Sequence, residues 1–327
     1  MSIEDHNGLI FIGENINATR KFLCRSKRIV HEDDRHYLTY QDLSGTARRL
    51  DLTAGFPEDW QDKKGAVVGH IAAGIVNQDM DFLTWAINAQ VEAGSHIIDV
   101  CVDEISIHPE ERHELMRWMV KTAQSITDVT LSIDSSDSDT IRAGLEVYDP
   151  SKARPAINST NLEEDRLSLI PMAKEFNAIL FGNGSSDEGM PYSSEERVSN
   201  MTELMRLMDE VDIPMEDRFL DPLVFPVGAG ADYGMHYLGA VKELRETYPD
   251  VHIFGGLSNI SFGLPGRKVV NNAFNILAIQ HGCDSLMIDP IMNPPQDLLE
   301  FKLASDVALG KDDFAVKYIE YWRSLSA

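Results

Sequence analysis

Cysteines and long apolar runs are scarce in this 327-residue sequence. Its three cysteines, Cys24, Cys101 and Cys283, are far apart and form no Cys-x-x-Cys pair. This spacing argues against a disulfide framework or a zinc knuckle and favours a reducing compartment. No apolar run approaches the length of a membrane span, and the first residues lack the basic-then-apolar layout of a signal peptide. We therefore expect a cytoplasmic protein that does not associate with membranes.

Positive charge is also in short supply. The sequence has 29 Lys and Arg against 53 Asp and Glu, which gives a formal net charge of −24. Such a surface repels phosphate backbones, so nucleic acid is not an expected partner. The stretch 20–28, RKFLCRSKR, is basic against this background. It is consistent either with a site for an anionic ligand tail or with a solvated loop.

Apolar residues are plentiful, at 43% of the sequence, and eight apolar runs of strand length alternate with helical patterns. The runs lack an apolar-polar alternation, as expected for parallel strands buried on both faces. They cover residues 9–12, 96–98, 130–133, 155–157, 178–181, 218–220, 251–254 and 285–288. This order predicts a (β/α)8 TIM barrel that forms a single domain over residues 1–327. An open doubly wound sheet is the alternative, but no Gly-x-Gly-x-x-Gly follows the first strand.

One connection is too long for an ordinary loop between a strand and a helix. The first strand ends near Glu14, and the next helical pattern begins near Asn77. We interpret the intervening insertion, at about residues 20–75, as an elaborated loop on the C-terminal face of the barrel. An N-terminal arm used in dimer contacts is the alternative.

Every predicted strand ends close to a carboxylate or an amide. A single Asp or Asn at such a position often caps the following helix. Eight of them are harder to explain in this way, because the carboxyl ends of barrel strands meet at the mouth, where the active sites of this fold lie. The residues are Glu14, Asp99, Asp134, Asn158, Asn183, Asp221, Asn259 and Asp289. A mouth lined in this way, with no obvious nucleophile, suits a flat polar heterocycle. A carboxylate can accept two parallel hydrogen bonds from the N–H groups on the edge of such a ring.

Several blocks in barrel order resemble the pterin-binding methyltransferases, which include methyltetrahydrofolate:corrinoid methyltransferase and the folate module of cobalamin-dependent methionine synthase. The blocks are GENIN at 13–17, IIDV at 97–100, LSIDS at 131–135, INST at 157–160, LDPL at 220–223 and GLSNIS at 256–261. The resemblance covers most of the chain except the insertion. It implies a dihydropteroate-synthase-like barrel that exchanges a methyl group between N5 of tetrahydrofolate, or of a related tetrahydropterin, and the cobalt of a corrinoid. In that family the corrinoid is cobalamin or a relative of it and is carried by another protein or domain, so a corrinoid-binding protein is the implied partner.

The resemblance also implies roles for particular residues. Asp134, Asn158 and Asp221 would bind the pterin ring, and Asn259 would lie at N5 as the catalytic residue. The pocket wall would be completed by Glu14, Asn17, Asp99 and Arg267. No metal ligand is implied. The family usually has Asp-x-Asn in its second block, where this chain has Asp99-Val100-Cys101, so we expect Cys101 to be a packed residue rather than a ligand.

The stretch FGGLSNISFGLPGR, residues 254–267, fits this chemistry. A methyl group on a tertiary amine has a poor leaving group, so an amide at N5 would help most in the transition state. The small residues Gly255, Gly256 and Ser258 would let the strand approach a flat ring closely.

Three alternatives stay open. A zinc-dependent corrinoid methyltransferase would need a Cys, His and Glu cluster, for which Cys283 near His281 is a start. A dihydropteroate synthase-like enzyme is less favoured, because the usual Asn-x-Thr-Pro-Asp-Ser-Phe signature is replaced by GENINAT at 13–19. A non-catalytic pterin-binding subunit is the third. We expect the chain to form a homodimer.

Overall fold

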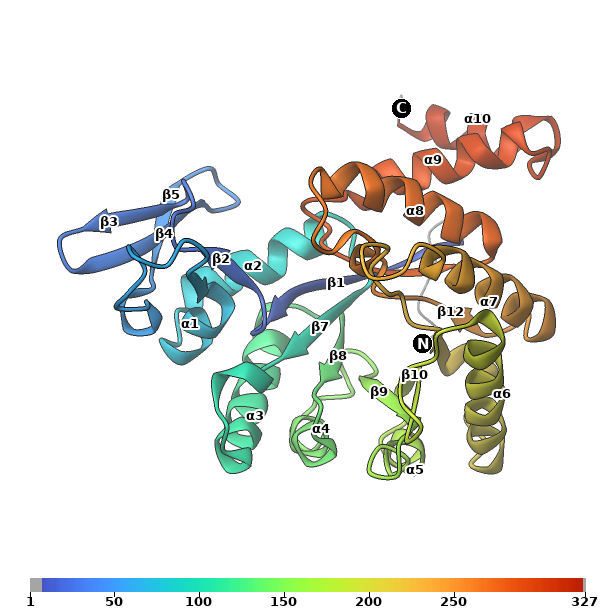
Figure 1. The fold of residues 1–327 in the computed structure, drawn as a ribbon, viewed down its shortest axis with the longest axis horizontal. Helices are drawn as coiled ribbons and strands as arrows, with labels where there is room; N and C mark the ends of the chain where they lie inside the picture. Colours follow the sequence, from blue (N-terminus) through green and yellow to red (C-terminus); the bar gives the residue numbers. More distant parts are fainter. Residues whose placement is uncertain (1–7, 326–327) are drawn as a thin grey trace.

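A ring of eight parallel strands forms the centre of the molecule (Figure 1). The computed structural model describes residues 8–325. The strands of the ring are β1 (Ile10–Asn17), β7 (Ile97–Cys101), β8 (Thr130–Asp134), β9 (Ala156–Leu162), β10 (Ile179–Ser186), β11 (Arg218–Asp221), β12 (His252–Ile253) and β13 (Ser285–Ile288). All eight strands predicted from the apolar runs are present.

The ring closes between β12 and β13. Ladder pairing runs in the order β12-β11-β10-β9-β8-β7-β1-β13. The N–H of Asp284 donates to Ile253 O at 3.1 Å, and the N–H of Met287 donates to Gly255 O at 3.3 Å. A parallel bridge also joins Gly256 to Met287. The predicted (β/α)8 barrel is therefore confirmed.

Helices follow the strands and surround the ring (Figure 1). They are α1 (His70–Val76), α2 (Met80–Glu92), α3 (Pro109–Ile126), α4 (Ser138–Leu145), α5 (Leu169–Glu175), α6 (Ser194–Glu210), α7 (Tyr233–Thr247) and α8 (Arg267–His281). Their ends follow local chemistry. The Asp79 side chain accepts from the N–H of Phe82 at the start of α2, and Gly94, with φ at +103°, lies just past its end.

Two apolar layers hold the barrel together. The inner layer fills the ring with alternate strand residues, Ile10, Ile12, Ile97, Ala156, Ile179, Phe181, Phe219 and Phe254. The outer layer packs the other strand face against the helices and includes the buried methionines of α6, Met201, Met205 and Met208. Parallel strands covered on both faces explain why the sequence shows unbroken apolar runs.

The insertion folds as β-structure rather than as an irregular loop. β2 (Lys21–Leu23) pairs with β6 (Val67–Gly69), and β3 (Ile29–Glu32), β4 (Arg35–Gln41) and β5 (Ala47–Asp51) form an antiparallel sheet. Figure 1 shows this sheet beside α1 and α2. Its Tyr40 ring lies 4.6 Å from that of Trp85 on α2. Since α1 begins at His70, the insertion ends earlier than the predicted residue 75.

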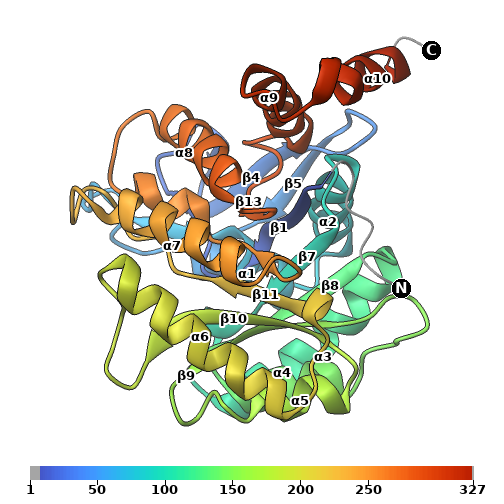
Figure 2. The ribbon, with the colours of Figure 1, turned by 90° about the vertical axis from the view of Figure 1, so that its right-hand side faces the viewer.

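Two further helices follow the last strand. Figure 2 shows α9 (Pro295–Ala308) and α10 (Val316–Ser324) beyond α8 at the edge of the barrel. No helix within residues 8–325 is long and apolar enough to cross a bilayer.

Candidate functional site

Six of the predicted site residues lie at the mouth of the barrel on strands. Side chains alternate between the two faces of a strand, so a residue two positions after an inner-layer residue also points into the ring. Asp99 follows Ile97 in this way, Asn158 follows Ala156, and Asp221 follows Phe219. The register shift in β1 between Gly13 and Ile16 changes the alternation along that strand, so Glu14 and Asn17 can both face inward. Asp134, at the end of β8, is paired in register with Asn158.

Asp99, Asp134, Asn158 and Asn17 form one hydrogen-bonded group. Asn158 Nδ2 donates to Asp99 Oδ1 at 3.0 Å, and Asn17 Nδ2 donates to Asp134 Oδ2 at 3.3 Å. Burial raises the pKa of Asp99, and burial together with the neighbouring Asp99 charge raises the pKa of Asp134. Two adjacent buried carboxyl groups of this kind favour holding a shared proton. The group therefore offers both a donor and acceptors to a ligand.

A second group on the mouth joins the first and last strands of the ring. Arg20, from the start of the insertion, forms ion pairs with Glu14 (3.3 Å) and with Asp289. Asn15 Nδ2 donates to Asp289 Oδ1 at 3.0 Å. Burial raises the pKa of Glu14 to about 7, and the Arg20 charge acts against this rise. Arg20 is the first residue of the basic stretch 20–28, for which a ligand site and a solvated loop were both open, and the structure places it at the mouth.

Asp221 lies on the opposite side of the ring from β1. Its Oδ1 accepts from the N–H of Leu223 at 2.8 Å. Burial raises its pKa to about 7, while hydrogen bonds from the N–H groups of Leu223 and Gly256, and then the charge of Arg197, act in the opposite direction. A Cβ on Gly255 would lie 2.7 Å from Tyr237 Oη and 3.2 Å from Asp221 Oδ1. Gly255 is thus required by packing within the protein, whatever ligand approaches it.

The structure places Asn259 and Arg267 at exposed positions after β12. The seventh strand, β12, ends at Ile253, and the exposed Asn259 lies beyond it on the short helix η4 (Leu257–Ser261) rather than at the strand end. Arg267 is the exposed first residue of α8, where Nε donates to Ser261 Oγ at 3.0 Å and Nη2 donates to Ser258 O at 2.9 Å. These bonds tie η4 to α8. Arg267 therefore holds the segment that carries Asn259.

Cys101 is buried, as expected, and sits opposite Asp134 in the ladder. Burial raises the pKa of its thiol. Asp103, which sequence reasoning did not single out, accepts from Ser135 Oγ at 2.5 Å and from the N–H of Ser136 at 2.7 Å. It fixes the turn after β8, and only its place two residues beyond β7 hinted at this.

Cys283 and His281 do not form a ligand cluster. Cys283 Sγ is buried and donates to Ser285 O at 3.2 Å, while His281 Nδ1 bonds Leu277 O within α8. Within the described part of the chain, no three His, Cys, Asp or Glu side chains are arranged to hold a metal ion.

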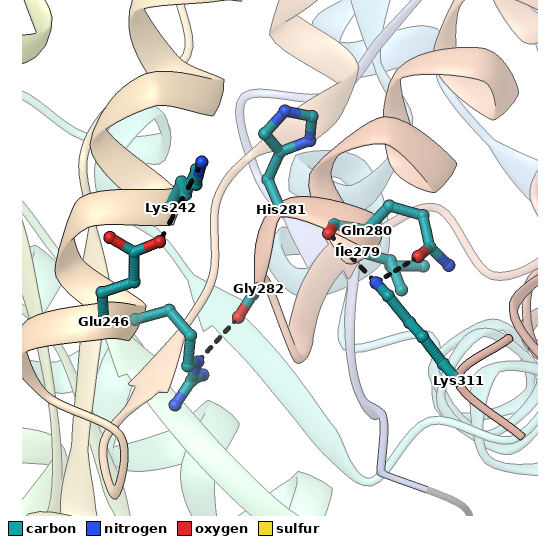
Figure 3. A pocket seen from close by; sticks show the side chains of 8 residues that line it. Lys242, Glu246, Ile279, Gln280, His281, Gly282 and Lys311 are labelled. Atoms are coloured by element: carbon teal, nitrogen blue, oxygen red, sulfur yellow. Dashed lines mark hydrogen bonds and ion pairs between the residues drawn. The ribbon is translucent and has the colours of Figure 1, made fainter. Parts of the chain in front are cut away.

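A pocket of about 480 Å3 lies between α7 and α8, near the ends from which the chain enters β12 and β13 (Figure 3). Helix ends that lead into strands lie at the barrel end away from the mouth. Two cations that line this pocket bond to groups nearby: Arg245 Nε donates to Gly282 O at 3.0 Å, and Lys311 Nζ donates to Gln280 Oε1 at 2.7 Å. None of the predicted site residues lines this pocket.

The fold and the mouth define a TIM-barrel protein with buried carboxyl and amide groups at the carboxyl ends of its strands. Residues 70–289 match the family described as pterin binding enzyme. This match covers more than half of the chain, and the chain belongs to that family. The insertion lies outside the matched residues.

The chain is also similar to a curated relative and to two solved structures. The chain is 29% identical over 265 residues to a methylcorrinoid:tetrahydrofolate methyltransferase of Eubacterium limosum, covering 80% of this chain and 94% of the relative. It resembles the dihydropteroate synthase of Stenotrophomonas maltophilia (TM-score 0.56, 15% identity, 69% and 89% covered). It also resembles that of Vibrio fischeri ES114 (TM-score 0.54, 16% identity, 68% and 87% covered). At these identities the two structures show a shared fold only.

Proposed function

We propose that the protein is a methyltransferase that exchanges a methyl group between N5 of tetrahydrofolate and the cobalt of a corrinoid. The observation that carries the proposal is the cluster of buried carboxyl groups at the mouth of a pterin-family barrel. The name of the Eubacterium limosum relative gives the direction from methylcorrinoid to tetrahydrofolate. We propose the same net direction for this chain, although one site serves both directions.

In this proposal the chain binds and orients the pterin. Asp221 accepts hydrogen bonds from one part of the pterin ring, and Asp134 and Asn158 bind another, with Asp99 holding Asn158 in place. Glu14, Asn17 and the Arg20 pair close the wall near β1. Asn259 lies above the ring at N5, held by the η4 segment that Arg267 ties down. The corrinoid supplies the methyl group and leaves as cobalt(I), and the N5 proton is released as the N5–CH3 bond forms.

The chemistry explains why amides and carboxyl groups suffice. The protein does not supply the nucleophile, because N5 attacks the methyl group in one direction and cobalt(I) attacks it in the other. What the protein changes is the charge at N5, which a hydrogen bond stabilises most in the transition state. Buried groups near their titration range are suited to this task.

The direct test is methyl transfer from free methylcobalamin to tetrahydrofolate under reducing, anaerobic conditions. We expect catalysed formation of cobalt(I) and methyltetrahydrofolate, with a large loss in Asp221→Asn. Full activity after treatment with a chelator would separate this enzyme from a zinc-dependent one. Condensation of a pterin pyrophosphate with p-aminobenzoate would instead identify a dihydropteroate synthase, and tetrahydrofolate binding without transfer would identify a non-catalytic subunit.

We further propose that the corrinoid is carried by a separate corrinoid-binding protein that docks on the mouth, since the name of the Eubacterium limosum relative makes a methylcorrinoid the methyl donor.

A homodimer is proposed from α10, which has no buried residue and exposes Ile319 and Trp322. Sedimentation of the wild type and of a Trp322→Glu variant tests the dimer. A cytoplasmic location is supported by the three buried, unpaired cysteines.

A further inference from the structure

Arg197 is a fully buried cation close to the Asp221 side of the mouth. It lies on α6, and its side chain has no exposed surface. Nη1 donates to Ser193 O at 2.9 Å, and the guanidinium lies 4.8 Å from the centre of the Phe225 ring. Nη2 is buried and has no hydrogen-bond partner within residues 8–325. A charge buried in this way is costly unless another group nearby compensates it.

Arg197 reaches the mouth through one residue of the loop after β11. Its Nε donates to Leu223 O at 3.2 Å. Leu223 has φ at +70°, a left-handed conformation that is unfavourable for a leucine. In this conformation the Leu223 N–H donates to Asp221 Oδ1 at 2.8 Å. The carbonyl of Leu223 thus accepts a hydrogen bond from Arg197, and the N–H of Leu223 donates one to the Asp221 carboxyl group.

Arg197 also supplies the charge that faces Asp221. Of the other titratable groups around Asp221, Tyr237 on α7 and Cys283 before β13 are buried, and burial raises the pKa of both, for Cys283 to about 12. Both are therefore neutral at pH 7. The Arg197 charge favours the ionised form of Asp221.

The remaining titratable groups near Arg197 lie on its own helix and on α7. Glu196 accepts from the N–H groups at the start of α6, including that of Ser193 at 3.0 Å, and Tyr233 begins α7. Hydrogen bonds from those N–H groups already balance the Glu196 carboxylate. Burial lowers the pKa of Arg197, and the Asp221 charge is the largest effect that acts against this lowering.

We propose that Arg197 is a positioning residue for Asp221: it fixes Leu223 in the conformation that orients the carboxyl group, and its buried charge lies behind that carboxyl group when the pterin binds. The inference rests on the proposed function for its ligand, but the geometry on which it depends is a property of the protein alone. Arg197 acts through Leu223 and does not touch the ligand.

The test measures the titration of Asp221 directly. Aspartate-selective 13C labelling and carboxyl NMR, with the signal assigned by its absence in Asp221→Asn, give the titration midpoint without any pterin. Two variants separate the two roles of Arg197. Arg197→Gln removes the charge and keeps an amide donor, whereas Arg197→Lys keeps the charge and loses the planar donor set that spans Leu223 and Ser193. Tetrahydrofolate binding is titrated in parallel, and melting curves report on folding.

We expect the Asp221 midpoint to move to higher pH in Arg197→Gln, which loses the charge, and to move less in Arg197→Lys, which keeps the charge but holds Leu223 less firmly. Tetrahydrofolate affinity at pH 7 should fall by about tenfold in the Gln variant, because a smaller fraction of Asp221 is ionised. An unchanged midpoint in the Gln variant, or an equal shift in both variants, would overturn the charge role. If the Gln variant does not fold, the Lys variant decides: weaker tetrahydrofolate binding supports the proposal, and unchanged binding overturns it. A wild type that does not bind tetrahydrofolate would overturn the proposed function and leave the NMR test of Arg197 intact.

Discussion

The side-chain amide of Asn158 donates a 3.0 Å hydrogen bond to Asp99 across an intervening strand, because Asn158 lies on β9 and Asp99 on β7. In a closed barrel, inward residues of alternate strands share a layer. Asn158 and Asp99 therefore form the floor of the mouth, and Asp134 on the strand between them lies next to both. A ligand that reaches this floor meets three polar side chains from three successive strands.

The contribution of Asp221 to the stability of the unliganded protein should fall as the pH rises from about 4 to about 7. Asp221 has a folded-state pKa of about 7 against an ordinary value of 3.8, so the folded state binds the proton more tightly. The stabilisation of the folded state by this proton is complete below pH 3.8, the ordinary pKa. It is lost as the pH rises through the folded-state pKa, and the loss is about 1.4 kcal/mol for each pH unit between the two pKa values. Urea unfolding of the wild type and Asp221→Asn at pH 5 and pH 8 measures the difference.

The variant should lose less stability than the wild type over this interval. The comparison cancels the opposite effect of His70, whose pKa is lowered to about 3 by burial and then by the charges of Arg20 and Arg28. Neutral His70 stabilises above its unfolded pKa, and this contribution is lost as the pH falls. Parallel pH dependences in the two proteins would contradict the burial of Asp221.

Asp221→Asn should weaken tetrahydrofolate binding more at pH 8 than at pH 6. Losing a hydrogen bond to a charged group costs about 1.5–3 kcal/mol, or roughly tenfold to over a hundredfold in affinity. At pH 6 most of the wild-type Asp221 is already protonated, so the difference should shrink. Calorimetry at both pH values tests this, with the exposed Asp232→Asn as the matched control.

Asp134→Asn should show a smaller and less pH-dependent loss of affinity, since burial and the Asp99 charge already favour a neutral Asp134. The same calorimetric titrations at pH 6 and pH 8 measure it. Wild-type affinity in both the Asp134 and the Asp221 variants would remove these residues from the pterin site.

Gly255→Ala should disturb the Asp221 side of the mouth. The new Cβ would lie 2.7 Å from Tyr237 Oη and 3.2 Å from Asp221 Oδ1, and overpacking of this kind costs about 1–3 kcal/mol of folding free energy. We expect a lower melting temperature and weaker tetrahydrofolate binding. Adding Tyr237→Phe removes the closest atom and should restore part of both losses. Gly65→Ala, where nothing lies within 4 Å of the new Cβ, is the control, and equal effects at both glycines would argue against this packing.

The sequence was sufficient for the barrel but not for its insertion. All eight strands were predictable because a parallel strand buried on both faces is a short, unbroken apolar run. The insertion strands carry mixed polar residues, as in Arg35–Gln41, RHYLTYQ, with one buried side chain. Such strands are stabilised by pairing and by contact with α2, which no local pattern records.

The carboxyl groups of the site were predictable for the same reason as the strands, since a polar residue that ends an apolar run in a barrel faces the mouth. Asn259 was misplaced because β12 is short and the chain after Ile253 forms η4. The Asp289 partner of Arg20 and the role of Arg197 were not predicted, because they depend on contacts with residues distant in sequence, Asp289 and Leu223 respectively. Burial of an arginine cannot be read from its neighbours along the chain.

Asn259→Ala should slow methyl transfer more than it weakens binding. The variant removes the donor and the acceptor from an exposed side chain on η4, so the buried packing of the barrel is unaffected. By analogy with the loss of one preorganised transition-state donor, we expect transfer to be roughly 10²–10³-fold slower. Tetrahydrofolate affinity should fall by about tenfold at most, because Asp134, Asn158 and Asp221 still hold the ring.

Single-turnover transfer between methylcobalamin and tetrahydrofolate, beside a direct binding titration, separates the two effects. Ser258→Ala is the matched control, because it changes a neighbouring side chain of η4 and keeps the backbone carbonyl that accepts from Arg267. Equal losses in rate and binding for Asn259→Ala would make Asn259 an ordinary binding contact. Transfer at the wild-type rate would mean that η4 only shapes the rim of the mouth. The charge at N5 would then have to be stabilised by the buried carboxyl groups. Asp221 would be the first candidate, because its pKa of about 7 lies near the pH at which the enzyme works.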